Sequence, residues 1–276
     1  MPPLSADQAR EFLARHPAID SIDLLIGDLN GVMRGKRIPR DKLDKVCRDG
    51  INLPASVFAL DINGHTIEAT GLGLASGDGD RICRPLEGTL FPSPWLRNGR
   101  QGQVLMTMVE PDDSPFFADP RQVLSRQLQR LHERGLTPVA AVEMEFYLLD
   151  RERTPEGWIQ PPRSPRNGER ASQSQLYSID ELDEYAAFLE DVQRAAELQN
   201  LPLDTALKEC APGQFEITLG HCNDALRACD SAVLLKRLVK GVALNHGFEA
   251  TFMAKPYGLE AGNGTHVHLS MLDARE

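Results

Sequence analysis

The sequence has few of the features that mark a membrane or secreted protein. Among its 276 residues, no apolar run approaches the ~18–20 residues needed to cross a bilayer. Residues 1–7, Met-Pro-Pro-Leu-Ser-Ala-Asp, lack a basic region followed by an apolar stretch, so we expect no signal peptide. The five cysteines are an odd number and form no Cys-x-x-Cys pair, which predicts reduced thiols. Together these absences predict a cytoplasmic protein with no membrane partner.

Basic residues are also scarce relative to acidic ones. The chain has 30 Lys and Arg against 40 Asp and Glu, which gives a formal charge of −10. A protein that binds a nucleic-acid backbone needs a basic face, so this balance argues against a nucleic-acid partner. Metal ions and cationic ligands are the expected companions instead.

The rest of the composition is typical of a globular protein, with 41% hydrophobic and 25% charged residues. Residues 1–112 predict a small sheet-rich domain, and the Pro- and Asp-containing loop at 110–115 predicts a boundary before a second domain, 113–276. Helices and strands are both predicted in the second domain. We expect helices after Ser5, Asp119 and Ser178 and over 224–246, and strands at 139–149, 214–219, 249–254 and 265–271.

Two acidic side chains share one face of the predicted strand 139–149. Because alternate residues of a strand point to the same side, Glu143 and Glu145 face together, while the apolar residues between and around them face the core. Adjacent like charges repel, and a bound divalent cation would remove that repulsion. For this pattern alone, a strand with a solvated outer face is the alternative interpretation.

The same alternation gives further metal-ligand candidates in two other predicted strands. Glu216 lies on the polar face of its strand, and Glu209 precedes it on the other side of a Pro-Gly turn. His266, His268 and Ser270 share one face of the last strand. Oxygen-rich ligation with one His suits Mg²⁺ or Mn²⁺ better than a structural zinc. Such ions commonly organise phosphoryl transfer.

Four sequence motifs occur in the order in which the glutamine synthetase family has them. They are Glu-Met-Glu-Phe-Tyr at 143–147, Glu-Cys-Ala-Pro-Gly-Gln-Phe-Glu at 209–216, Phe-Met-Ala-Lys-Pro at 252–256 and Gly-Asn-Gly-Thr-His-Val-His at 262–268. The chain therefore resembles this family over nearly its whole length. The γ-glutamylpolyamine synthetase branch is the part of the family that it resembles more closely, through Ala-Pro-Gly-Gln-Phe-Glu at 211–216 and Ala-Lys-Pro-Tyr at 254–257 followed by Ala-Gly-Asn-Gly-Thr-His-Val-His at 261–268.

The resemblance implies an N-terminal β-grasp-like domain, a catalytic α+β domain and a ring-shaped homo-oligomer, commonly a dodecamer. It implies ATP-dependent ligation of the glutamate γ-carboxylate to an amine through γ-glutamyl phosphate, with two Mg²⁺ or Mn²⁺ ions. Members of the family are longer than this chain. The resemblance thus implies that the chain is the N-terminal part of a longer enzyme and is inactive alone.

The resemblance also implies a role for each residue that matches a functional position of the family. These residues are Glu145, Glu209 and Glu216 for the first metal, Glu143 and His266 for the second metal, Gly262 for glutamate, His268 and Ser270 for ATP, and Asp80 as a catalytic acid.

Two departures from the family pattern concern the amine. Ordinary glutamine synthetases carry Asp-Gly-Ser-Ser in the N-terminal domain, where the Asp helps to bind ammonium. Here residues 52–58 read Asn-Leu-Pro-Ala-Ser-Val-Phe, and Ala261 replaces an Asn beside Gly262. Both changes favour a polyamine such as putrescine. The apolar side chains of 53–58 would then lie against its methylenes; the alternative is that Leu53, Val57 and Phe58 fill the core of the small domain. An ordinary glutamine synthetase that uses ammonium and a catalytically inactive binding or scaffold protein are the alternatives.

Overall fold

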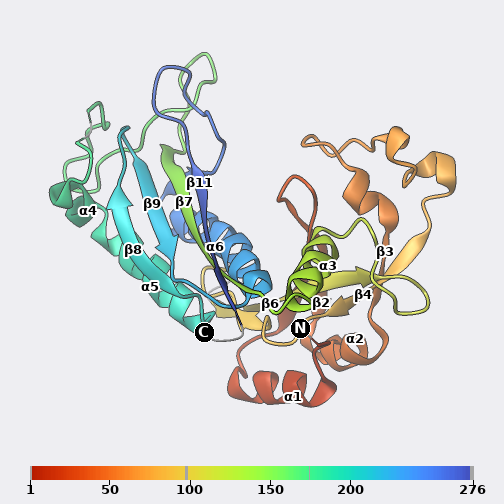
Figure 1. The fold of residues 1–276 in the computed structure, drawn as a ribbon. Helices are drawn as coiled ribbons and strands as arrows, with labels where there is room; N and C mark the ends of the chain where they lie inside the picture. Colours follow the sequence, from red (N-terminus) through yellow and green to blue (C-terminus); the bar gives the residue numbers. More distant parts are fainter. Residues whose placement is uncertain (1, 97–98, 174, 274–276) are drawn as a thin grey trace. The chain divides into compact units, whose positions relative to one another are not determined.

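The chain forms two compact units, Met1–Arg130 and Leu131–Glu276, in a computed structural model that describes residues 2–96, 99–173 and 175–273 (Figure 1). The first unit thus extends beyond the boundary at 112 that the sequence predicts. Phe116 lies in the hydrophobic core of the first unit. The Asp119 carboxylate accepts hydrogen bonds from the Thr107 hydroxyl at 2.7 Å and the Met108 N–H at 2.8 Å. These contacts fasten the segment after the predicted linker to the first unit.

The first unit is built on a mixed sheet in the order β2-β1-β6-β4-β3, with β5 also paired to β6. Strands β1 and β6 are parallel and the other pairs are antiparallel, which is the β-grasp-like arrangement expected. Its elements are α1 (Ala6–Arg15), β1 (Ser21–Gly27), β2 (Met33–Pro39), α2 (Leu43–Asp49), β3 (Ile51–Pro54), β4 (Asp80–Pro85), β5 (Phe91–Pro92), β6 (Gln101–Val109) and α3 (Pro120–His132), the last of which crosses into the second unit.

Local signals in the sequence account for the first elements of this unit. Ser5 and Gln8 form a capping box at the start of α1, in which the Ser5 hydroxyl oxygen accepts from the Gln8 N–H and the Gln8 amide oxygen accepts from the Ser5 N–H. A turn through Asn30 and Gly31, a typical hairpin sequence, joins β1 to β2, and the two strands pair antiparallel. Helix α2 follows β2 after a short 3₁₀ helix at Arg40–Lys42 and was not expected. Every residue of β6 is buried, as the centre of a sheet requires.

The apolar residues of segment 53–58 belong to the core of the first unit. Leu53, Val57 and Phe58 are 7%, 8% and 1% exposed and pack within one hydrophobic cluster. Because their own unit encloses these side chains, the alternative that they fill the core is confirmed, and the prediction that they lie against the methylenes of an amine is wrong. Their apolar character is explained by core packing.

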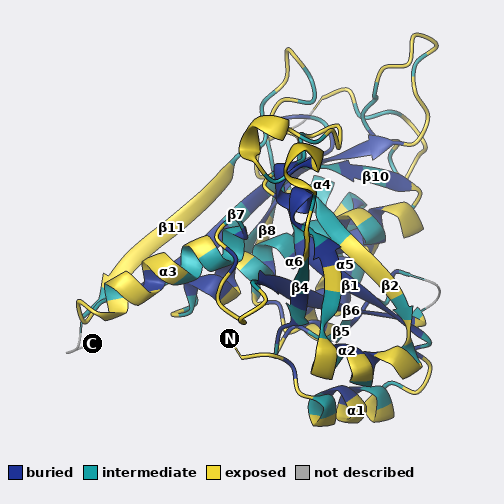
Figure 2. Cartoon of the chain, turned by 90° about the vertical axis from the view of Figure 1, so that its right-hand side faces the viewer, coloured by how far each residue is buried: buried dark blue, intermediate teal, exposed yellow. Residues whose placement is uncertain are grey.

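The second unit is an antiparallel sheet in the order β10-β7-β9-β8, with β11 also paired to β7. Strand β11 is exposed along almost its whole length (Figure 2). No helix in the described part of the chain has the length and apolar character to span a membrane. The elements are β7 (Thr137–Asp150), α4 (Ile179–Glu184), α5 (Ala186–Leu198), β8 (Leu203–Lys208), β9 (Gln214–Leu219), α6 (Ala225–Asn245), β10 (Phe248–Thr251) and β11 (Thr265–Leu272).

Two features of the second unit differ from the sequence prediction. The helix expected after Ser178 is divided at Tyr185, whose backbone leaves helical geometry. The Tyr185 ring is buried against Phe215 at a centroid distance of 5.2 Å, so core packing accounts for the break. Strand β8 was not expected either, because its fully buried residue is Lys208 rather than an apolar side chain.

Helices cover one face of the second sheet and leave the other for polar side chains. Helix α6 contacts β7, β9 and β10, and α5 packs beside α6. The Phe146 ring of β7 points to this side, with its centroid 6.3 Å from that of Phe188 in α5. Because side chains alternate along a strand, Glu143 and Glu145 point to the opposite face.

A glycine turn carries the chain between two of the predicted ligands, Glu209 and Glu216. Gly213 has a φ of +74°, and a Cβ there would lie 2.5 Å from Pro162 Cδ and 2.9 Å from the Leu148 carbonyl oxygen. Gly247 has a similar φ of +79° but open space around it. The two glycines therefore share a backbone conformation and differ in steric surroundings.

Gly213→Ala is expected to destabilise the chain more than Gly247→Ala. Both variants place a side chain in the left-handed region, which costs roughly 1–2 kcal/mol. Only Gly213→Ala adds a clash, for roughly 1–3 kcal/mol more. Urea unfolding of both variants measures the free energies of unfolding. Equal decreases in the free energy of unfolding would show that the turn rearranges to accept the added Cβ and does not hold Glu209 and Glu216 rigidly.

Candidate metal centre

The strand register brings the predicted ligands of the sheet next to one another. Glu145 in β7 is directly opposite Glu216 in β9. Glu143 in β7 is opposite His266 in β11. Opposite residues on neighbouring strands have Cβ atoms only ~4.5–5.5 Å apart, and like charges in such positions destabilise a sheet. The sheet therefore contains a concentrated negative charge.

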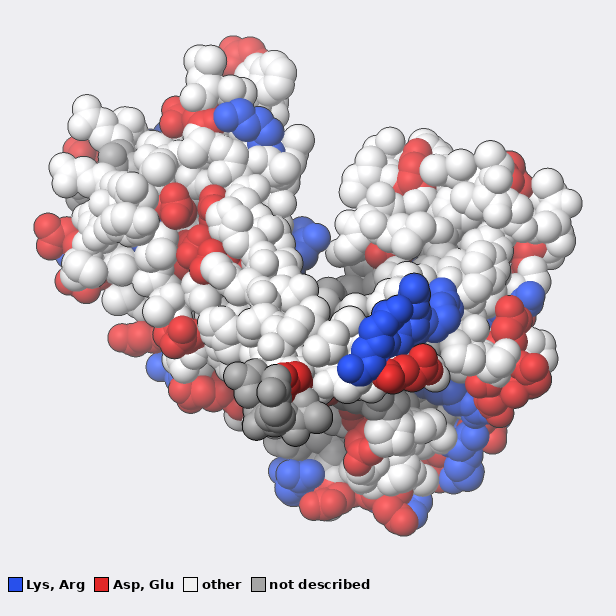
Figure 3. All heavy atoms as spheres, in the orientation of Figure 1, with Lys and Arg blue, Asp and Glu red and all other residues white. Residues whose placement is uncertain are grey.

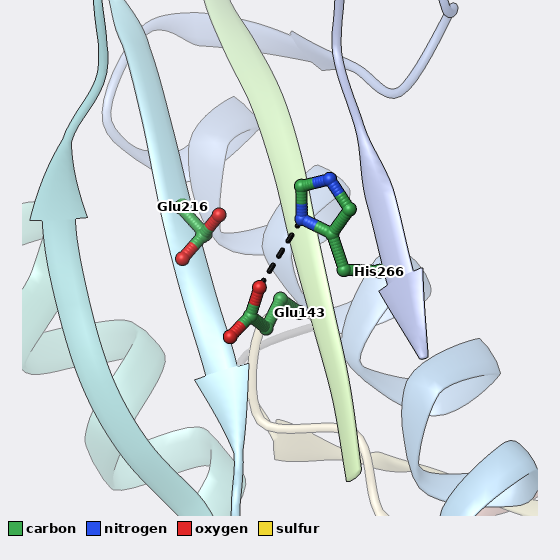
Figure 4. A group of neighbouring side chains, drawn as sticks. All are labelled: Glu143, Glu216 and His266. Carbon is green, nitrogen blue, oxygen red and sulfur yellow. Dashed lines mark hydrogen bonds and ion pairs between the residues drawn. The ribbon is translucent and has the colours of Figure 1, made fainter. Parts of the chain in front are cut away.

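The five predicted metal ligands form two groups that share Glu216. In each group, one potential ligand atom from every residue lies within 4.8 Å of the others. Figure 3 shows acidic atoms gathered over the strands of the second unit, and Figure 4 shows one group, with Glu143 and Glu216 directed toward each other. The groups are Glu145, Glu209 and Glu216, here named site A, and Glu143, Glu216 and His266, here named site B.

Burial makes the shared carboxylate electrostatically costly. Glu216 is 7% exposed. Its pKa is raised above the ordinary 4.5, first by loss of hydration and then by the charges of Glu143, Glu145 and Glu209. Oxygen donors with one imidazole fit Mg²⁺ or Mn²⁺. A divalent cation in either group would offset the repulsion, so the donor set and its electrostatics fit the ions that the sequence predicts.

Both histidines of β11 interact with the same carboxylate. His266 Nδ1 lies 3.1 Å from Glu143 Oε2, and His268 Nε2 lies 2.8 Å from Glu143 Oε1. His266 is thus in reach of site B as the sequence predicts. The structure adds that His268 contacts Glu143, whereas its contact with ATP stays a prediction.

A buried lysine supports the turn that carries Glu209. Lys208 has no exposed surface, and burial lowers the pKa of its ammonium group. Its Nζ donates to the carbonyl oxygens of Glu209 at 2.8 Å and Ala211 at 2.7 Å. Sequence reasoning missed this residue. The one sequence feature that could have indicated it is its position directly before Glu209, a predicted ligand.

The other predicted site residues lie in three different places. The Gly262 carbonyl accepts a hydrogen bond from the side chain of Gln214 at 2.9 Å. A Cβ at Gly262 would lie 2.7 Å from the Ala254 carbonyl oxygen, so a larger residue does not fit there. Ser270 is exposed on β11, opposite Val139. Asp80 is exposed at the start of β4 in the first unit. Their contacts with substrates stay predictions.

Glu145→Ala is expected to weaken Mn²⁺ binding at site A. Removing one carboxylate from a group of three leaves fewer oxygen ligands for a hard cation, so a loss of at least about tenfold in affinity is expected. Calorimetric titration of residues 1–276 with Mn²⁺ measures it. Glu190→Ala, which removes an exposed carboxylate from α5, is the control. Equal Mn²⁺ affinity of Glu145→Ala and wild type would contradict site A.

Glu216→Gln is expected to stabilise the metal-free chain at neutral pH. A carboxyl with a raised pKa binds its proton more tightly in the folded chain, so its stability contribution falls as pH rises above 4.5 toward and through the raised value. With a chelator at pH 8, the variant should unfold at a temperature higher by roughly 2–4 °C for each kcal/mol relieved.

Thermal unfolding at pH 4 and pH 8 checks the sign, because the difference should shrink at pH 4. Glu190→Gln provides the control for removal of a charge alone. A lower unfolding temperature of Glu216→Gln at pH 8 would show that Glu216 is not under repulsion. Addition of Mn²⁺ should raise the unfolding temperature of wild type more than that of Glu216→Gln, since the variant has lost a shared ligand.

Known proteins have sequences similar to nearly the whole of this chain. Gamma-glutamylputrescine synthetase PuuA of Escherichia coli (strain K12) is 49% identical over 268 residues, which are 97% of this chain and 56% of that protein. Glutamate–isopropylamine ligase of Pseudomonas sp is 30% identical over 271 residues, 96% of this chain and 57% of that protein. The chain thus spans a little over half the length of these curated relatives.

A comparison of folds and a comparison with protein families point to the same group of proteins. A solved structure described as "Apo GmaS without ligand" matches with a TM-score of 0.77 at 27% identity, over 95% of this chain and 56% of that chain. The family described as glutamine synthetase, catalytic domain, matches residues 117–276, more than half of the chain. The chain therefore belongs to the glutamine synthetase catalytic domain family.

Proposed function

We propose that the protein that contains this chain ligates the γ-carboxylate of glutamate to an amine, with ATP, through γ-glutamyl phosphate. The observation that carries this proposal is the convergence of four carboxylates and His266 in two groups that share Glu216. Two cation sites side by side are typical of enzymes that transfer phosphoryl groups. The proposal thus assigns sites A and B to Mg²⁺ or Mn²⁺.

The reaction proposed needs charge neutralisation and positioning. Cations held by the two groups would supply positive charge for the acceptor carboxylate and the ATP phosphates. A γ-carboxylate oxygen of glutamate takes the γ-phosphoryl group from ATP. The amine nitrogen then bonds to the acyl carbon, phosphate leaves, and the amine gives up a proton. In this proposal Gly262 contacts glutamate, while His268 and Ser270, which are exposed on β11, contact ATP.

A polyamine such as putrescine is the proposed amine. The 49% identity with a gamma-glutamylputrescine synthetase supports it, as does the absence of an acid in residues 52–58. A diamine needs a carboxylate for its distal ammonium group. Asp61 and Glu68 accept hydrogen bonds from backbone N–H groups of their own loop. Asp80 is exposed, so it is the candidate acid of the amine side.

The assembly proposed is a cytoplasmic homo-oligomer, a ring and commonly a dodecamer, as the family resemblance implies. Light scattering on the full gene product tests the number of subunits. A monomer at micromolar concentration would contradict the ring.

The full gene product is expected to use putrescine at least about tenfold better than ammonium, measured as kcat/KM. An ammonium pocket must be small and anionic to hold a compact cation, and residues 52–58 contain no acid for that purpose. Phosphate release with ATP, glutamate and putrescine, spermidine, ethanolamine or ammonium measures the preference.

A kcat/KM for ammonium within a few-fold of that for the best diamine would contradict the polyamine assignment and indicate an ordinary glutamine synthetase. Absence of turnover with every amine, with Mn²⁺ still bound, would favour a binding or scaffold protein. Residues 1–276 alone are expected to release no phosphate, because they span about 56% of the length of the similar synthetase.

A further inference from the structure

Gln214 links the metal-ligand strand to two loops of the site. Its side chain is fully buried at the start of β9. The amide nitrogen lies 3.1 Å from Glu145 Oε2, 2.9 Å from the Gly262 carbonyl oxygen and 3.2 Å from Asn263 Oδ1. The amide oxygen accepts from the Ala211 N–H at 3.2 Å. One side chain thus contacts a predicted ligand of site A, the loop predicted to bind glutamate, and the turn between Glu209 and Glu216.

The amide has fewer hydrogens than acceptors around it. A glutamine side chain carries two N–H groups, whereas three oxygens lie within hydrogen-bond distance of Nε2. The acceptors therefore share the donors, and a change at one acceptor alters the bonds available to the others. Because the side chain is buried, water cannot replace a lost partner, so each lost hydrogen bond costs more free energy than it would at the surface.

The loop packs closely against the same carboxylate. The Glu145 N–H donates to the Gly264 carbonyl oxygen at 3.2 Å, and a Cβ at Gly264 would lie 2.7 Å from Glu145 Oε1. Glu145 is therefore in contact with the loop on one side and with Gln214 at Oε2, which leaves few orientations for the carboxylate. Site A needs this carboxylate turned toward Glu209 and Glu216.

We propose that Gln214 is a positioning residue that orients Glu145 for site A and couples cation binding there to the order of the loop at 262–263. The assignment rests on the proposed metal centre. Hydrogen bonds to a ligating carboxylate fix its orientation, and their removal typically costs 10–100-fold in metal affinity. Binding at one end of the linkage favours binding at the other by the same factor, so cation and glutamate reinforce each other.

Gln214→Leu is the variant that tests the assignment, because leucine fills similar volume and donates no hydrogen bond. Mn²⁺ titration of residues 1–276, followed by the electron paramagnetic resonance signal of free Mn²⁺, should show one class of sites weakened about 10–100-fold. The other class, site B, should stay within a few-fold of wild type. In a Glu145→Ala background, Gln214→Leu should add no further loss.

Ile217→Ala is the matched control for destabilisation. Ile217 lies in the same strand and is 2% exposed. Its variant should lose stability while both Mn²⁺ affinities stay unchanged. If Ile217→Ala weakens site A as much as Gln214→Leu does, general loosening explains the effect and the assignment is overturned.

Hydrogen exchange on wild type and on Gln214→Leu tests the coupling to the loop. Mn²⁺ should slow exchange in a peptide covering 261–264 by at least about threefold, and Gln214→Leu should abolish this slowing. Two observations would overturn the coupling while leaving the metal centre intact: unchanged exchange with Mn²⁺ bound, or unchanged site A affinity in Gln214→Leu. Failure of wild type to bind Mn²⁺ would overturn the metal centre and this assignment with it.

Discussion

Repulsion between carboxylates on adjacent strands is the constraint on which the second unit depends. Glu145 and Glu216 are direct partners in the register of β7 and β9, and neither can move far without shifting the whole ladder. The opposite face of the same strands supplies the compensating interactions. Phe146 there packs with Phe188 and Phe215, at centroid distances of 6.3 and 6.1 Å. Packing on the apolar face thus offsets the repulsion between carboxylates on the acidic face of the same strands.

Positive charge and hydrogen-bond donors inside the unit complete this arrangement. Lys208 holds the turn that presents Glu209, and Gln214 contacts Glu145. Both side chains are fully buried, which is unusual for these residue types and is tolerated because their polar atoms are bonded. The acidic groups are therefore oriented from within the protein, and they lie on the side of the sheet that faces away from the helices, where the cations and substrates are proposed to bind.

Sequence periodicity predicts the strands of the site well, because the alternation of polar and apolar residues in β7, β9 and β11 directly reflects their two faces. Features that depend on tertiary packing were not predictable in the same way. The break at Tyr185 follows from the packing of its ring in the core. Strand β8 was not recognised because its fully buried residue is Lys208, a residue type that is rarely buried. The burial of Phe58 likewise depends on contacts distant in sequence, so its apolar character alone did not distinguish a ligand pocket from the core.

The central claim is that the carboxylates of one sheet face form a paired divalent-cation centre. Anomalous diffraction at the manganese edge, from crystals of residues 1–276 grown with Mn²⁺, tests it most directly. The account predicts two peaks, one bounded by Glu145, Glu209 and Glu216 and the other by Glu143, Glu216 and His266. Manganese bound only to carboxylates elsewhere on this acidic chain, or no bound manganese at all, would contradict it.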